Sequence, residues 1–252
     1  MSSQTATDEK RAAAQRLNRI VYKLAKRWLL IANTLLGILI ILPWLAPIFM
    51  QLGLETPARV IHVGYMALCH QFPQRSYFLF GPEAMYTLDE VSLVWDNIAN
   101  PLELRRFIGT PEMGWKVAWS DRMVSMYGAL FLFGVLYHFV RDRLKPLPFW
   151  GLVLFLMPMG IDGVTHVISD LYGLTNGFRY HNQWLAELTN YAFDPLFYSG
   201  NAFWSFNWWM RLLSGIFFGL GVVWFAFPYL ESGFKQTQRE IEVKFRQANL
   251  EL

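Results

Sequence analysis

Long apolar runs separated by short charged segments dominate the pattern along the chain. The first run extends from Trp28 to Met50 without a charge. Because a helix rises 1.5 Å per residue, an apolar helix of about 20 residues crosses a hydrocarbon layer of roughly 30 Å. Further runs predict spans over residues 123–140, 148–172 and 208–229. The pattern therefore predicts an all-α, polytopic membrane helix bundle with about four transmembrane helices.

One shorter apolar segment, from Arg59 to His70, has two interpretations. About a dozen residues are too few to span a bilayer, which favours a re-entrant or interfacial helix. If the segment did span, the orientation of every later span would invert. The basic loop that contains Arg141 would then lie outside, against the charge pattern described next.

Lys and Arg are unevenly distributed between the two predicted sides of the membrane. Seven of the 22 precede the first span, three lie between the second and third, and four follow the fourth. Basic residues concentrate in cytoplasmic loops. We therefore expect a multi-pass protein of the cell membrane with both termini in the cytoplasm.

The remaining segments are shorter and more polar. Residues 1–27 predict a cytoplasmic basic tail, loose over its first 20 residues, and residues 28–230 predict the membrane domain. Three prolines within residues 81–119 favour an outer cap of short helices. Residues 190–209, rich in Phe, Tyr and Trp, are typical of a lid in the outer interface. Residues 231–252 predict a charged cytoplasmic helix at the inner surface.

Composition agrees with this fold class. The chain is 54% hydrophobic and 17% aromatic, and its net charge is +3. The basic residues are accounted for by membrane orientation, so no nucleic-acid partner is expected. One cysteine excludes an internal disulfide and any metal site built on several cysteines.

Three ionisable residues share one face of the predicted third span. Asp162, His166 and Asp170 follow each other at intervals of four, so they project over about two helical turns. Ionisable groups in hydrocarbon are costly, so they suggest a functional site. The alternative is that they face the bundle interior and hydrogen-bond to neighbouring helices.

A metal site is one possible use of these residues. Thiolate, imidazole and carboxylate ligands suit a divalent transition metal such as zinc. Cys69 and His70 are placed on the same outer side, so we expect Cys69, His70, Asp162 and His166 to be the candidate ligands. Simple packing of the cysteine remains an alternative. A noncovalent haem held by two histidines is a further possibility.

Arginines form the second part of the candidate site. Arg179 follows a turn signal and can hold a carboxylate or phosphate through two hydrogen bonds, as can Arg75. Asp121 and Arg122, at the outer entrance to the second span, are a further possible acid–base pair. For catalysis we expect Asp162, His166, Arg179 and Arg75, the carboxylate or imidazole acting as base and the arginines holding an anion.

These residues carry a resemblance to a family of membrane proteins of unknown function. The islands are Cys69-His70-Gln71-x-Pro73-x-Arg75-Ser76, Arg122 to Tyr127, and Ile161-Asp162-Gly163-x-Thr165-His166 with Thr175-Asn176-x-x-Arg179. Over residues 55–180 the chain resembles the family known as domain of unknown function 2085. Ser120 and Met123 stand where the family has two cysteines. The resemblance implies a polytopic membrane fold and no established activity.

Three classes of function remain open. One is an enzyme that acts at the outer leaflet on a lipid or quinone-like substrate. The second is a non-catalytic subunit or assembly factor that docks with protein partners in a membrane complex. The third is transport, which the apolar inner half of the third span disfavours because it offers no continuous polar path.

Overall fold

The structure is a computed structural model that describes residues 2–96, 98 and 100–252, with side chains described from residue 9. Four of its helices are long and apolar enough to cross a membrane. They are α2 (Trp28–Gln51), α6 (Asp121–Val140), α7 (Phe149–Leu171) and the first part of α11 (Phe206–Gln247). The fold class predicted from the sequence is confirmed.

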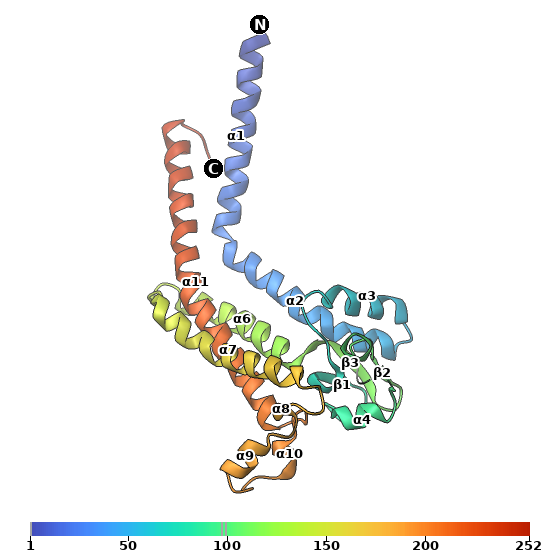
Figure 1. Cartoon of the computed structure of the whole chain (residues 1–252). Coiled ribbons are helices and arrows are strands. Elements are labelled where there is room, and N and C mark those ends of the chain that lie inside the picture. Colours follow the sequence, from blue (N-terminus) through green and yellow to red (C-terminus); the bar gives the residue numbers. More distant parts are fainter. Residues whose placement is uncertain (1, 97, 99) are drawn as a thin grey trace.

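The four spanning helices form a tilted bundle, and the long connections between them lie at one end, whereas the short connection between α6 and α7 lies at the other (Figure 1). Residues 52–120 connect α2 with α6, and residues 172–205 connect α7 with α11. We call these two connections the cap. The short helices of the cap are α3 (Glu55–Tyr65), the 3₁₀ turn η1 (Pro73–Arg75), α4 (Leu88–Ser92), α5 (Pro101–Leu104), α8 (Phe178–His181), α9 (Gln183–Leu188) and α10 (Pro195–Tyr198).

The cap also contains a sheet, which the sequence analysis does not predict. Strands β1 (Ser76–Leu79), β2 (Gly109–Thr110) and β3 (Gly114–Ser120) form an antiparallel sheet in the order β1-β3-β2. Within 81–119 the expected short helices are present as α4 and α5, but residues 109–110 and 114–119 form strands in place of helices. The physical cause of β3 is the pattern Trp115, Val117, Trp119, whose β-branched and aromatic side chains favour a pleated surface.

Close packing between α6 and α11 holds the bundle together. A Cβ atom on Gly215 would lie 2.1 Å from the Oγ of Ser125, and one on Gly219 would lie 2.5 Å from the Cβ of Ala129. Small residues four apart let two membrane helices approach closely. This approach places the first turn of α6 next to the second turn of α11 at the cap.

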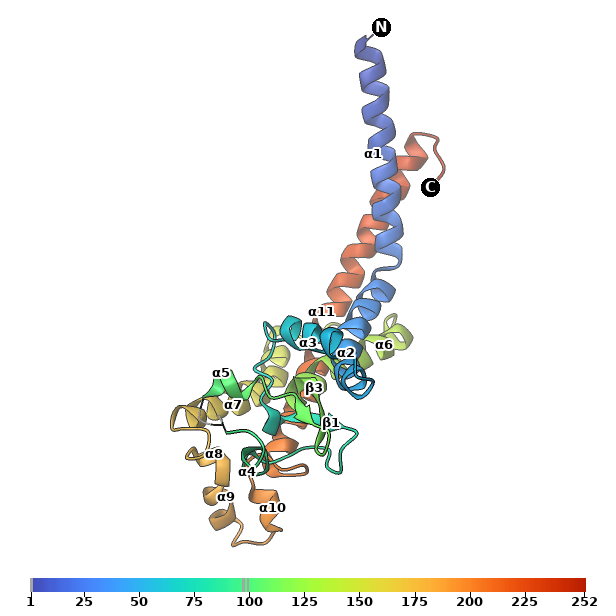
Figure 2. The ribbon, with the colours of Figure 1, turned by 90° about the vertical axis from the view of Figure 1, so that its right-hand side faces the viewer.

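A stalk of two helices rises from the other end of the bundle (Figures 1 and 2). Helix α1 (Ser2–Lys26) packs beside the last part of α11, where Tyr22 donates to Glu242 across 2.9 Å. Residues 2–20 are thus helical, not a loose tail, because Ala and long straight side chains favour a helix. The charged C-terminal segment continues α11 without a break and is not a separate surface helix.

Candidate functional site: an arginine-rich cavity beside the cap

The polar face predicted for the third span is present on α7. Asp162 and His166 are buried, with 5% and 3% of their surfaces exposed, and Asp170 is half-buried one turn nearer the cap. All three face the bundle and the cap, while Val164 and Leu171 are exposed on α7. The 3.6-residue period of the helix brings the three polar side chains together.

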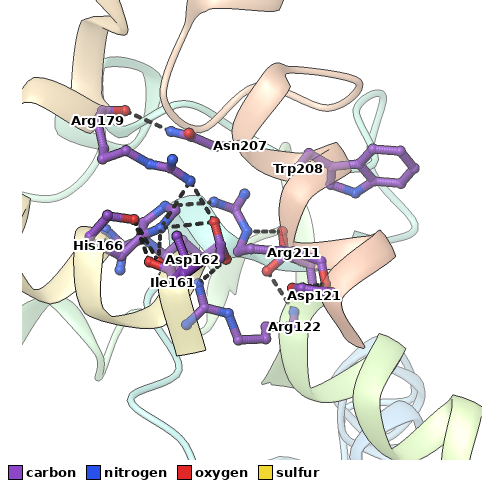
Figure 3. Close-up of polar contacts among 12 residues, drawn as sticks. Asp121, Arg122, Ile161, Asp162, His166, Arg179, Asn207, Trp208 and Arg211 are labelled. Atoms are coloured by element: carbon purple, nitrogen blue, oxygen red, sulfur yellow. Dashed lines mark hydrogen bonds and ion pairs between the residues drawn. The ribbon is translucent and has the colours of Figure 1, made fainter. Parts of the chain in front are cut away.

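Asp162 holds two guanidinium groups. Arg122 from the first turn of α6 donates to its Oδ2 across 2.6 Å, and Arg179 from α8 donates to its Oδ1 across 2.5 Å (Figure 3). Charge-assisted bonds of this length are strong in a low-dielectric site. One carboxylate therefore neutralises only one of the two positive charges that it holds.

Local structure fixes Arg179 in this position. Its backbone N–H donates to the Oγ of Ser169 on α7, and its carbonyl accepts from Asn207 on α11 across 2.6 Å. Close contact with Ser169 requires Gly177, because a Cβ there would lie 2.3 Å from the Ser169 carbonyl oxygen. Burial lowers the pKa of Arg179, and the carboxylate of Asp162 opposes that effect.

His166 lies between two of the arginines. Its Nδ1 is 2.9 Å from the carbonyl oxygen of Asp162, and its Nε2 is 3.3 Å from Nη1 of Arg211. A neutral ring with the proton on Nδ1 donates to the carbonyl and accepts from Arg211 at Nε2. Nη2 of Arg179, which lies 3.3 Å from Nδ1, then donates to Asp162 and not to the ring. In this tautomer His166 positions the guanidinium group of Arg211.

Two further ion pairs complete the cluster. Arg211 on α11 donates through Nε to Asp121 across 2.6 Å. Arg75 donates two hydrogen bonds of 3.0 and 2.7 Å to the carboxylate of Asp170. With Arg122 and Arg179 on Asp162, four arginines face three aspartates, which leaves one positive charge. We call these seven residues the arginine cluster.

A cavity of about 620 Å³ opens beside the arginine cluster. Its polar wall includes Arg75, Arg122 and Arg211, and its apolar wall includes Val167 and Leu171. These two apolar residues are 62% and 81% exposed on a spanning helix, so the cavity continues into the apolar outer surface of the bundle. The cavity therefore joins a cationic interior to a lipid-facing side.

Several guanidinium nitrogens of the arginine cluster are enclosed without a hydrogen-bond partner in the described part of the chain. Nη2 of Arg211 and the Nε atoms of Arg75 and Arg122 are buried and have no hydrogen-bond partner among the residues that the structure describes. Buried donors of this kind call for an acceptor. The excess positive charge of the arginine cluster suits an anion better than a neutral or cationic ligand.

The predicted metal site is not assembled. Across residues 2–96, 98 and 100–252, no group of three or more His, Cys, Asp or Glu side chains is arranged to hold a metal ion. Asp162 is held by arginines, and Sγ of Cys69 lies 3.4 Å from the Oγ of Ser120. His70 packs against Phe72, with ring centroids 5.7 Å apart. Cys69 and His70 line the cavity but do not join Asp162 and His166 in one ligand set.

Other predicted residues are distributed as follows. Arg75, Asp170, Asp121 and Arg122 belong to the arginine cluster, as the shared outer side predicts. His181, at the end of the same short helix as Arg179, lines a separate smaller cavity next to α10. The role of Arg211 was not predicted from the sequence. Its signal is an arginine within an apolar span, which marks a buried partner.

Comparisons with known proteins agree with the resemblance seen in the sequence. The family described as "Predicted membrane protein" and numbered as domain of unknown function 2085 matches residues 112–225, a segment that includes α6, α7 and most of the arginine cluster. An uncharacterized protein of Methanocaldococcus jannaschii is 27% identical over 154 residues, which cover 58% of this chain and 76% of the relative. No solved structure matches. The resemblance to this family of membrane proteins is confirmed over the matched segment.

Proposed function

We propose that this membrane protein binds an amphiphile with an anionic head group in the cavity beside the arginine cluster. The observation that carries the proposal is the combination of one excess positive charge with an apolar wall that continues into the surface of α7. The head group would lie against Arg75, Arg122 and Arg211, with its apolar part along Val167 and Leu171.

The chemistry of the two walls supports this assignment. Guanidinium groups match carboxylate and phosphate oxygens in geometry, and the hydrogen bonds between them are stronger where water is excluded. A ligand without an apolar part would leave the wall formed by Val167 and Leu171 exposed to water, at a cost that grows with apolar area. An amphiphile satisfies both walls, which is why a lipid fits better than free phosphate.

The proposal also concerns the side of the membrane on which the cavity lies. The basic residues before α2 and in the loop around Arg141 favour the cytoplasmic side, so we propose that the cap and its cavity face outward. The ligand would then enter from the outer leaflet. Catalytic roles for Asp162, His166, Arg179 and Arg75 stay a prediction, and turnover of a bound lipid is the measurement that decides it.

The single cysteine provides a direct test, because Cys69 lines the cavity. The full chain would be placed in phosphatidylcholine nanodiscs, and the rate of alkylation of Cys69 by a maleimide measured as phosphatidic acid or oleate is added. We expect both anionic amphiphiles to slow alkylation. Added phosphatidylcholine and inorganic phosphate serve as the zwitterionic and headgroup-only controls, and neither is expected to protect.

Two arginine variants make the test specific. In Arg122→Gln, Asp162 keeps Arg179, so the excess charge is removed without leaving a carboxylate alone. Loss of a charge-assisted bond of about 1.5–3 kcal/mol predicts binding roughly tenfold to a hundredfold weaker. Arg106→Gln removes the same charge from an exposed side chain of the cap and is expected to have no effect. Equal protection in wild type and Arg122→Gln would contradict the proposal.

A second candidate function is favoured by the far tip of the cap, around α9 and α10. Leu188, Tyr191 and Leu196 are 75%, 60% and 63% exposed there. An exposed apolar patch of this kind is typical of a protein-docking surface, as expected for a subunit of a membrane complex. Tyr191→Ser with Leu196→Ser would abolish co-purification of a partner while leaving the protection of Cys69 unchanged.

A further inference from the structure

The stalk and the bundle meet at a sharp change of direction between α1 and α2. Helix α1 ends at Lys26 and α2 begins at Trp28, with Arg27 between them (Figures 1 and 2). We call this junction the elbow. A groove of about 430 Å³ lies at the elbow. The residues that line it are Ile20, Lys23, Leu24, Arg27, Leu30, Ile31, Thr34 and Leu35.

The groove lies on the side of α1 that does not pack on α11. Ala25 is buried, and its carbonyl accepts a hydrogen bond from Gln238 of α11 across 3.1 Å. On the groove side, Ile20, Leu24 and Leu30 are 55%, 52% and 65% exposed. Contacts within the described residues thus cover one face of α1 and leave the apolar face at the elbow open.

The two walls of the groove differ in chemistry. Leu30, Ile31 and Leu35 belong to α2, a helix apolar enough to cross a membrane, so this wall continues the lipid-facing surface. Lys23 and Arg27 lie at the polar boundary of that helix, and no acidic residue lines the groove. Neither of these two cations forms an ion pair with another residue in the described part of the chain.

We propose that the elbow is a binding site for an anionic phospholipid. Its phosphate lies between Lys23 and Arg27, and an acyl chain follows Leu30, Ile31 and Leu35 along α2. Basic side chains at the end of a membrane helix attract acidic head groups, and the apolar wall accepts the chain. This site is at the opposite end of the bundle from the arginine cluster and is independent of the function proposed for the cap.

The test counts bound lipids on the intact chain. The protein would be equilibrated in nanodiscs of phosphatidylcholine with a minor fraction of phosphatidylglycerol, transferred to mild detergent, and examined by native mass spectrometry. Wild type is expected to retain phosphatidylglycerol over phosphatidylcholine. Lys23→Gln with Arg27→Gln is expected to weaken that retention roughly thirtyfold, since each basic residue near a membrane surface contributes about 1 kcal/mol.

The matched control removes the same charge from the same helix. Lys10 and Arg11 are exposed on α1 far from the elbow, so Lys10→Gln with Arg11→Gln is expected to keep the lipid preference. An equal loss in both double variants would mean diffuse attraction to acidic lipid and would overturn the proposal. So would unchanged retention in the elbow variant. A wild-type dimer that the elbow variant dissociates, with lipid counts unchanged, would show that a second copy fills the groove.

Discussion

Arg211 of α11 and Asp121 of α6 form an ion pair that is almost completely enclosed. Nε of Arg211 donates to Oδ2 of Asp121 across 2.6 Å, and each side chain is only 2% exposed. The pair ties the first turn of α6 to the second turn of α11, where the cap meets the bundle. Since Nη1 of Arg211 also contacts His166, the same pair fixes one wall of the arginine cluster.

Removing one member of this pair should destabilise the protein strongly. In Asp121→Asn the guanidinium of Arg211 loses its carboxylate while it stays buried, which costs about 3–5 kcal/mol. Asp121→Asn combined with Arg211→Gln should cost less than the sum of the single variants, because no charge is left alone. Unfolding in detergent with increasing dodecyl sulfate measures the free energies. Glu103→Gln, which breaks an exposed pair with Arg106, is the control and should cost about 0–1 kcal/mol.

Burial of Lys116 in the cap should make the free energy of unfolding depend on pH. Its Nζ donates to the carbonyl oxygens of Gln71 and Arg105 across 2.7 and 3.0 Å, and burial lowers the pKa of Lys116 to about 7. The unfolded chain keeps this amine protonated up to its ordinary pKa of 10.5. Between these two values the unfolded state binds more protons, so the free energy of unfolding should rise with pH, by at most about 1.4 kcal/mol per pH unit.

The comparison with Lys116→Met isolates this contribution. Thermal unfolding of wild type and variant would be followed between neutral pH and pH 10, and the difference between the two curves taken at each pH. The wild type should gain stability relative to the variant as the pH rises, and the difference should be flat below neutral pH. A difference independent of pH over the whole range would show that Lys116 stays charged when buried.

The parts of the structure that follow from local periodicity could be predicted from the sequence. Apolar run length located α2, α6, α7 and the start of α11 within a few residues, because a membrane helix must satisfy its backbone internally over a fixed thickness. The spacing of Asp162 and His166 likewise placed both side chains on one face of α7. Both inferences use one segment at a time.

The parts that depend on distant segments could not be predicted. Strand β1 pairs with β3 across a connection of more than thirty residues, and no local sequence pattern predicts the register of this pairing. The sequence also indicates that a buried Asp162 requires a positively charged partner, but it does not indicate whether that partner is a metal ion or a basic side chain. Arg122 and Arg179 supply it from two other helices, and the predicted ligands Cys69, His70, Asp162 and His166 are not grouped in the described part of the chain.

The contact between α6 and α11 requires Gly219. A Cβ at this position would lie 2.5 Å from the Cβ of Ala129 and 2.7 Å from the backbone nitrogen of Leu130, which cannot move away cheaply. Gly219→Ala should therefore cost about 1–3 kcal/mol, typical of overpacking. Gly160→Ala on α7 meets nothing within 4 Å in the described structure and should be neutral or slightly stabilising. Equal stability of the two variants in detergent unfolding would contradict close packing at this contact.

The orientation proposed for the bundle predicts which face of the membrane each loop occupies. Leu93 of the cap is 83% exposed, and the side chain of Asp142, between α6 and α7, is 75% exposed. In a Cys69→Ser background, Leu93→Cys should react with a membrane-impermeant maleimide in intact cells. Asp142→Cys should react only after the membrane is permeabilised. The reverse pattern would place the cap and its arginine cluster on the cytoplasmic side, and the ligand of the cavity would then have to come from the inner leaflet.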